Sequence, residues 1–219
     1  MLDLHLDKPG QLSVCIDFQD LDSLLLLKPA IRFAEEHELA LKFLPMVGEP
    51  RVSSRQPGPP DDDEMARYKA HRQKIRGSYV DMDRLRNAAL LGLTETDINP
   101  SVDTNLASLG LLWLWQAEPE AELHYVRRVF DAVFRKHKDV AQVEVVNLLV
   151  EEAGVSLRGF GEFQHGEGRV GLDALQDRLL ESGLYRAAAV YLAGEWYIGR
   201  EHFPLLIWKL NGETGHPPV

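Results

Sequence analysis

The sequence predicts an α/β (α+β) protein in which a block of helices interrupts one small mixed sheet. Three observations predict this fold class. The N-terminal part has the pattern strand, helix, strand, and the C-terminal part has the pattern helix, strand, strand, helix. Between them, from Asp61 to Gly154, every periodic stretch has helical spacing. The helices are therefore expected to form an insertion between two halves of one sheet.

The N-terminal unit is predicted from its apolar spacing. Residues 11–18 alternate loosely and carry β-branched side chains, which favours a strand, and residues 39–46 form a second one. Apolar side chains recur every three or four residues between 21 and 37, which indicates a helix. Asp20 or Asp22 stands where a helix N-cap belongs. The unit is therefore a β-α-β segment with a parallel strand pair.

The middle of the chain predicts a loop followed by helices. Proline and glycine accumulate in residues 47–60, which favours a loop. Acidic residues 61–64 open the first helix, where they complement its positive end. Further helices are expected near residues 81–92, 102–116, 119–136 and 139–153. Residues 106–115 are apolar nearly all round, which predicts a buried central helix and leaves a contact between two copies of the chain as the alternative.

The C-terminal unit is predicted from its glycines and its last apolar runs. Residues 159–171 are glycine-rich and are expected to form a loop, followed by a helix over 172–182 that ends at Gly183. Residues 187–193 and 195–198 predict a hairpin with Gly194 at its turn. A last helix is expected over 201–210. Residues 11–60 and 155–211 would then form one discontinuous domain, 61–154 a helical insertion and 212–219 a flexible tail.

Composition excludes several functions. The 24 Lys and Arg against 34 Asp and Glu give a net charge of −10, so we expect no nucleic-acid partner. The single cysteine cannot form an internal disulfide or a two-thiol redox pair. The eight histidines show no i, i+3 or i, i+4 pairing, so no metal site is expected. The start lacks a secretory pattern and no apolar run could span a bilayer, so we expect no membrane partner and a cytoplasmic location.

The predicted order, β-α-β, helices, then α-β-β-α, is that of a thioredoxin-like fold with a large helical insertion. Three segments add a resemblance. Asp17-Phe18 before a helix is similar to an Asp-Phe-x-Ser-Pro-Tyr start, and residues 83–92 and 99–109 are similar to Arg-x-Ala-x-x-x-Gly and Pro-x-Asn-Thr stretches. Residues 183–210 resemble a Gly-Val-Phe-Gly-Val-Pro-Thr-Phe…Gly-Glu…Trp-Gly-x-Asp-Arg segment. The chain thus resembles the DsbA-like thioredoxin superfamily, in the branch of 2-hydroxychromene-2-carboxylate isomerases and kappa-class glutathione transferases.

The resemblance implies where an active site would lie, and the chain departs from the family there. The catalytic Ser or first Cys of the family falls on Asp20, and its cis-proline falls on Ala188. A cis peptide without proline costs about 3 kcal/mol, so we expect the Ala188 peptide to be trans. The Asn of the third stretch falls on Asp103. The last Asp falls on Glu201, which the resemblance implies as a contact for an α-amino group.

The candidate site residues follow from this alignment. Asp20 is the candidate catalytic residue as a general base, with a helix cap as the alternative, and Cys15 is expected to be structural because it lies inside the first strand. The candidate ligand-binding residues are Asp22, Asp103, Ala188, Ala189, Arg200 and Glu201. The resemblance implies glutathione as a ligand, although no cofactor is certain from the residues.

Two functions remain open from the sequence. The first is a catalytically degenerate member that binds a small molecule or a protein. The second is a glutathione-dependent isomerase or transferase of the 2-hydroxychromene-2-carboxylate isomerase type. Both predict a small-molecule partner, glutathione included, and a homodimer is compatible with either. Dithiol redox activity is not expected, because the chain has one cysteine.

Overall fold

The computed structural model describes residues 8–48 and 64–218. Its sheet has four strands in the order β2-β1-β3-β4, with β1 (Gln11–Ile16) parallel to β2 (Ala40–Pro45) and antiparallel to β3 (Ala189–Leu192). The hairpin partner β4 (Glu195–Ile198) completes the other edge. The predicted mixed sheet, formed by both ends of the chain, is confirmed.

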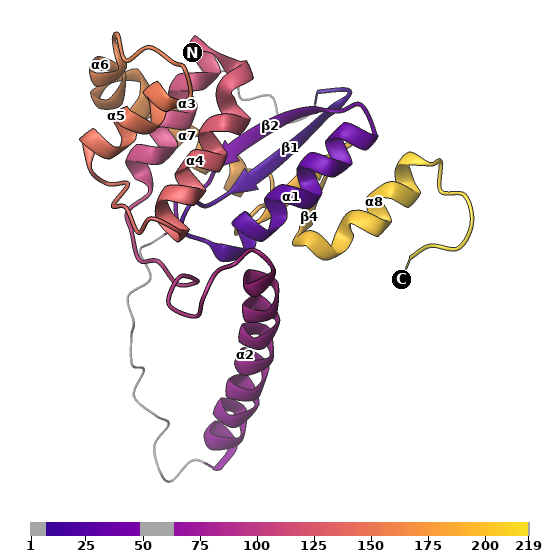
Figure 1. The fold of residues 1–219 in the computed structure, drawn as a ribbon. Helices are drawn as coiled ribbons and strands as arrows, with labels where there is room; N and C mark the ends of the chain where they lie inside the picture. Colours follow the sequence, from indigo (N-terminus) through magenta and orange to yellow (C-terminus); the bar gives the residue numbers. More distant parts are fainter. Residues whose placement is uncertain (1–7, 49–63, 219) are drawn as a thin grey trace.

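The helix α1 (Leu21–Glu36) crosses from β1 to β2 and contacts three of the strands. At the other end of the chain, a short 3-10 turn (Arg200–His202) leads into α8 (Phe203–Leu210). The Phe33 and Phe203 rings lie 5.3 Å apart and join α1 to α8, which Figure 1 shows on the same side of the sheet. The last helix was expected to begin at residue 201 and begins at Phe203, after the 3-10 turn. Pro204 lies in its first turn, where proline is tolerated.

The hairpin between β3 and β4 turns at the predicted place. Ala193 and Gly194 both have positive φ, 50° and 90°, as a two-residue turn of the I′ type requires. Glycine adopts this conformation without cost, whereas Ala193 is strained there. Pairing of Leu192 with Glu195 closes the hairpin.

The helical part is built around α3 (Asn105–Ala117), which α4 (Glu122–Phe134), α5 (Val143–Glu152), α6 (Phe160–His165) and α7 (Glu167–Glu181) all contact. A 3-10 turn (Pro119–Ala121) connects α3 to α4. The predicted buried central helix is confirmed, since seven of the α3 residues are buried. Burial inside this bundle also removes most of α3 from contact with a second copy. Figure 1 shows the bundle beside the β2 edge of the sheet.

Two expectations for the helices are wrong. The separate helix expected over 81–92 is the end of a single 27-residue helix, α2 (Glu64–Leu90), and residues 61–63, expected to open it, lie outside the described residues. The loop expected over 159–171 contains α6 and the start of α7. Phe163 packs directly over Gly168, where a Cβ would overlap its ring, so this glycine allows close packing instead of marking a loop.

The two parts share one core. The Phe18 ring at the end of β1 lies 5.3 Å from Phe130 and 6.4 Å, edge to face, from Tyr125 of α4. A partly buried ion pair links the same helix to the sheet edge, with Lys42 Nζ 2.6 Å from Glu122 Oε1. The domain boundary at residue 154 stays a prediction, although α6 and α7 beyond it pack on α3. No helix of the described ranges is both long enough and apolar enough to cross a bilayer.

Candidate functional site

The N-terminus of α1 is capped by Asp20. This residue has extended backbone angles (φ −94°, ψ 121°), and its Oδ2 accepts a hydrogen bond from Ser23 N at 3.2 Å. The Ser23 hydroxyl donates to the same oxygen at 3.4 Å. An aspartate here satisfies orphan N–H groups and complements the positive helix end. The predicted cap is therefore confirmed, at the position onto which the resemblance places a nucleophile.

Two arginines cross-link the acidic residues at this helix end. Arg84 of α2 approaches both carboxylates of α1, with Nη2 3.3 Å from Asp20 Oδ1 and Nε 3.5 Å from Asp22 Oδ1. Arg200 bridges Asp22, at 3.9 Å, and Asp83 of α2, at 2.7 Å. The structure thus brings together Asp20, Asp22 and Arg200, which the sequence predicted as site residues. The sequence predicted no role for Arg84 or Asp83, although both lie in the stretch 83–92 that carried part of the resemblance.

The carboxyl of Asp22 has a raised pKa. Burial raises the pKa of the Asp22 carboxyl above its ordinary value, and the charge of Asp20 raises it further. Arg84, Arg200 and Arg186 act in the opposite direction and do not cancel the effect of burial. Asp22 therefore holds a proton more readily than an ordinary exposed aspartate does.

Two adjoining hollows open at these residues. One, of about 530 Å³, is lined by Asp20 and Arg84 and by the apolar residues Met46, Leu180 and Leu184. The second, of about 820 Å³, is lined by Tyr79, Asp83, Ala188, Arg200 and Glu201, among others. Four residues border both hollows: Asp22, Arg84, Arg186 and Ala187. The two hollows therefore meet at the α1 N-terminus.

The loop before β3 forms part of this wall without proline. No peptide bond in the described ranges is cis, so the predicted trans peptide at Ala188 is confirmed. The carbonyl of Ala188 accepts a hydrogen bond from Gly199 N at 2.8 Å, which holds the loop against the segment leading to Arg200. Ala189 was expected to contact a ligand, but its position does not support such a contact. It is fully buried in β3, opposite Cys15, and borders neither hollow.

Beneath the cap lies Asp17, a buried carboxylate that borders the smaller hollow. Its Oδ1 accepts from Gln19 N at 3.1 Å and from the hydroxyl of Thr104 at 3.5 Å, while its own N–H donates to Ser23 Oγ at 3.0 Å. A Cβ on Gly48 would lie 2.5 Å from Asp17 Oδ2, so only glycine fits there. Sequence reasoning used Asp17 for the resemblance and missed its place in the site.

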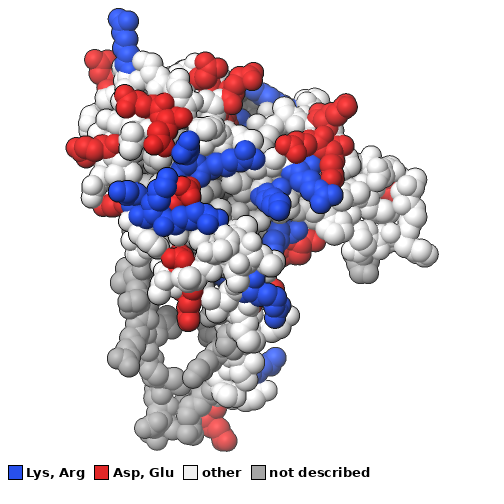
Figure 2. Space-filling model, in the orientation of Figure 1, with Lys and Arg blue, Asp and Glu red and all other residues white. Residues whose placement is uncertain are grey.

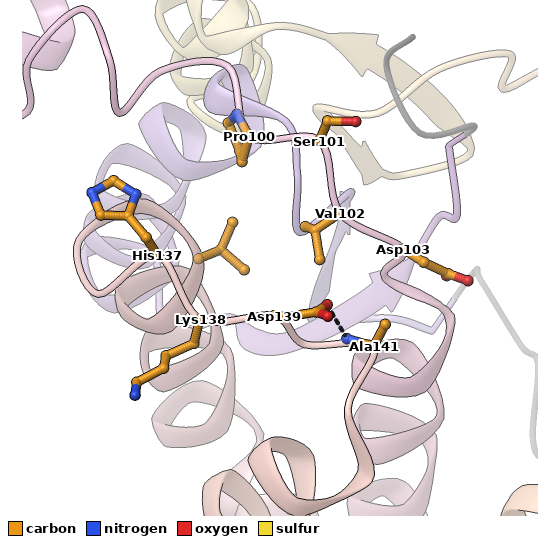
Figure 3. Close-up of a pocket in the computed structure, with 9 residues that line it drawn as sticks. Pro100, Ser101, Val102, Asp103, His137, Lys138, Asp139 and Ala141 are labelled. Carbon is orange, nitrogen blue, oxygen red and sulfur yellow. Dashed lines mark hydrogen bonds between the residues drawn. The ribbon is translucent and has the colours of Figure 1, made fainter.

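Asp103 and Glu201 are the two remaining candidate residues. Asp103 borders neither hollow, and its Oδ1 accepts a hydrogen bond from Asn105 N, the first residue of α3, at 2.8 Å. It borders a different cavity, of about 470 Å³, with His137, Lys138 and Asp139 (Figure 3). Glu201 does border the larger hollow, but its carboxylate folds back over Gly199. The structure therefore does not place Asp103 in the wall of either hollow, although its neighbour Thr104 contacts Asp17.

Thiol and metal chemistry are limited by the side chains present. Cys15 is fully buried in β1, and burial raises the pKa of its thiol, with a further contribution from Asp17. Such a thiol is inert, which confirms its structural role. Across the described residues, no three His, Cys, Asp or Glu side chains group closely enough to hold a metal ion.

Basic side chains gather across the middle of one face, among acidic ones (Figure 2).

No protein-family model matches the chain, and no curated protein matches its sequence. Solved structures do match its fold. The structure of 2-hydroxychromene-2-carboxylate isomerase aligns with a TM-score of 0.62 at 16% identity, covering 94% of this chain and 99% of that one. A probable DsbA oxidoreductase from Streptomyces coelicolor aligns at 0.62 and 14% identity, covering 95% and 93%.

The cytosolic disulfide reductase DsbM from Pseudomonas aeruginosa, solved with GSH, aligns with a TM-score of 0.55 at 16% identity, covering 93% of this chain and 98% of that one. These alignments extend over sheet and helical insertion together, because each covers more than nine-tenths of both chains. The chain therefore has the DsbA-like thioredoxin fold, in the form shared by 2-hydroxychromene-2-carboxylate isomerase and the DsbA-type oxidoreductases.

Proposed function

We propose that this protein binds a small molecule at the α1 N-terminus and does not carry out the thiol or serine chemistry of its fold. The observation that carries the proposal is the position of Asp20. Its carboxylate caps the helix and faces Arg84, so an anion already occupies the place that a reactive thiolate or alkoxide would need. A second negative charge there would be repelled by Asp20 and Asp22.

The charges that line the hollows support a ligand that carries both signs. Arg84, Arg186 and Arg200 offer guanidinium groups for carboxylates. Asp22 and Glu201 offer carboxylates for an ammonium group. Glutathione has two carboxylates and one ammonium, and DsbM of the same fold was solved with GSH. Glutathione is therefore the first ligand to test.

Arg84 gives a further reason to expect a ligand. Its Nε is buried and makes no hydrogen bond within the described residues, since the 3.5 Å approach to Asp22 is an ion pair only. A buried donor without a hydrogen bond costs about 1–3 kcal/mol. A ligand carboxylate that shifts Asp22 or Arg84 slightly would satisfy this donor.

The decisive experiment is titration of the full chain with reduced glutathione, followed by calorimetry and amide NMR. We expect a dissociation constant of about 1 mM or tighter, with shifts at Asp22, Ala187 and Arg200. Arg200→Gln should weaken binding about tenfold. Arg158→Gln, an exposed arginine that borders neither hollow, is the matched control and should not change it. Absence of shifts at 10 mM glutathione would exclude this ligand.

A second candidate function is glutathione-dependent isomerisation of the 2-hydroxychromene-2-carboxylate type, and Asp22 favours it. Burial raises the pKa of this carboxyl in a hollow that a substrate could enter, as proton transfer requires. Incubation with 2-hydroxychromene-2-carboxylate and glutathione, followed by ultraviolet absorbance, tests it. Turnover that Asp22→Asn abolishes would favour the enzyme, and no turnover with measurable glutathione binding would favour the binder.

The proposal includes a cytoplasmic location. The chain has a single, buried cysteine and therefore gains nothing from an oxidising compartment. DsbM, which shares the fold, is described as cytosolic. Fractionation of cells that express the protein at its natural level checks the location, and recovery outside the cytosol would contradict it.

A further inference from the structure

The outer face of α2 carries a row of exposed apolar side chains. Successive members lie three, four or seven residues apart, and each side chain is between 53 and 67% exposed. They are Met65, Tyr68, Ile75, Tyr79 and Met82. This is the a/d spacing of a coiled-coil seam, with Arg72 at the one a/d position that is not apolar. Figure 1 shows that α2 projects from the body of the protein.

We propose that this seam pairs with the α2 seam of a second copy of the chain, in antiparallel orientation. In an antiparallel coiled coil each a position faces a d position of the partner helix. On α2, a single register pairs an a position with a d position in every layer. In this register Met65 faces Met82, Tyr68 faces Tyr79, and Arg72 faces Ile75. The same pairs recur when the two helices are exchanged, which is the self-complementarity that a twofold interface requires.

Arg72 selects the antiparallel orientation. In a parallel pair, Arg72 would face Arg72 of the second copy, and two like charges would meet at the centre of the seam. In the antiparallel pair it faces Ile75 instead. Arg72 already lies over the ring of Tyr68, 5.9 Å from its centroid, so its stem can cover the apolar row. The antiparallel orientation also places the two bodies at opposite ends.

The seam is large enough to support a weak dimer. A buried Tyr side chain covers about 150–250 Å², so five side chains exposed by a little over half contribute on the order of 500 Å² per helix. Two helices then bury about 1,000 Å² from these side chains alone, which is near the lower limit for a specific interface. The stems of flanking Lys and Arg side chains add to this area.

The pairing would also change the candidate site. Tyr79 borders the larger hollow, together with Asp83 and Arg84 of the same helix. In the proposed register the second copy's Tyr68 packs beside Tyr79 and extends the wall of that hollow. The inference does not rest on the proposed function, because it follows from the α2 surface alone.

The first test measures the mass of the full chain by light scattering after size exclusion at about 100 µM. We expect about twice the 24.7 kDa of one chain. Tyr68→Glu should give a monomer with unchanged circular dichroism. Val170→Glu, which places the same charge on a 70%-exposed apolar position of α7, is the control and should stay dimeric. A monomeric parent chain, or a dimer unaffected by Tyr68→Glu, overturns the proposal.

The second test determines the register. Residues 65 and 82 lie about 25 Å apart along one helix, at 1.5 Å per residue, so they cannot form a disulfide within it. The double variant Met65→Cys/Met82→Cys should form a covalent dimer under mild oxidation. Met65→Cys alone should not, because it faces methionine in the antiparallel register. Efficient cross-linking of that single variant would show a parallel pair and overturn the proposal.

The salt dependence of the dimer tests the charges along the seam. Lys69 and Arg72 are basic residues in the N-terminal half of α2. In the proposed register the Arg72 side chains of the two copies lie on adjacent layers, so the dimer should be about tenfold tighter at 0.5 M than at 0.05 M salt. Dimerisation that weakens with salt would contradict this register.

Discussion

Arg84 reaches across from the protruding helix α2 to the cap of α1, with its Nη2 3.3 Å from Asp20 Oδ1. The two residues are 64 positions apart in the chain. Both side chains are about 14% exposed, so the ion pair is well shielded from solvent. Asp20 therefore has two roles, because one oxygen caps the helix and the other holds the helical insertion against the sheet domain.

The first prediction separates these roles. Asp20→Ala removes both and should lower the free energy of unfolding by about 1–2 kcal/mol, chiefly through the lost cap. Asp20→Ser retains a capping hydroxyl and should recover more than half of this loss. Urea unfolding followed by fluorescence measures both variants. If Asp20→Ser is no more stable than Asp20→Ala, the hydrogen bond to Ser23 is not the main contribution of Asp20.

The second prediction tests whether the α1 N-terminus still favours a thiolate. The native chain should react with no thiol reagent while folded, because Cys15 is buried, and with one equivalent when unfolded. Asp20→Cys should add one reactive thiol in the native state. The helix end and Arg84 should hold its pKa below the ordinary value of about 8.5. Alkylation rates against pH measure it, and a pKa above 8.5 would show that Asp22 dominates this position.

The sheet and the cap could be predicted because their signals are local. Strand alternation, the N-cap preference of Asp20 and the turn glycine at Gly194 each depend on a few neighbouring residues. The site could be predicted only in part, for the same reason. Asp20, Asp22 and Arg200 could be inferred from a resemblance, whereas the contact of Arg84 with Asp20 depends on how two distant helices pack.

The errors also have physical causes. Glycines suggested a loop over 159–171, but Phe160 and Phe163 are buried against the bundle, and Gly168 allows the Phe163 ring to approach. Packing therefore outweighs the poor helix propensity of glycine here. Ala189 was assigned to the site from its place beside Ala188. Strand alternation turns its side chain to the other face, into the core.

The third prediction concerns the ion pair between Lys42 and Glu122. Burial raises the pKa of the Glu122 carboxyl, and Lys42 and the N–H of Phe43 only partly oppose this. The folded state therefore holds a proton more tightly than the unfolded state, so this group makes the protein less stable as pH rises above the ordinary glutamate value of 4.5.

Glu122→Gln removes this titration while an amide oxygen can still accept from Phe43 N. The two proteins should be about equally stable at pH 4, where Glu122 is protonated. At pH 7 the glutamine variant should be the more stable one. Urea unfolding between pH 4 and 8 measures the difference. A parent chain that gains stability over the variant as pH rises would show that Lys42 outweighs burial.

The last prediction concerns the contact between α3 and α4. Tyr125 is fully buried and donates a hydrogen bond to the carbonyl of Ala107 at 2.9 Å. Its ring passes over Gly110, where a Cβ would overlap the tyrosine hydroxyl and lie 3.3 Å from Val146 Cγ1. Alanine favours a helix over glycine by about 0.5–1 kcal/mol, but forcing extra atoms into a packed core costs about 1–3 kcal/mol.

Gly110→Ala should therefore destabilise the protein by about 1–2 kcal/mol, because the overlap outweighs the gain in helix propensity. Gly77→Ala on α2 is the matched control, since its Cβ would meet no heavy atom within 4 Å. That variant should gain about 0.5–1 kcal/mol from propensity alone. Urea unfolding of both variants measures the contrast. Equal stabilisation of the two would mean that Tyr125 moves aside freely, and that α3 and α4 are less tightly packed than their contact indicates.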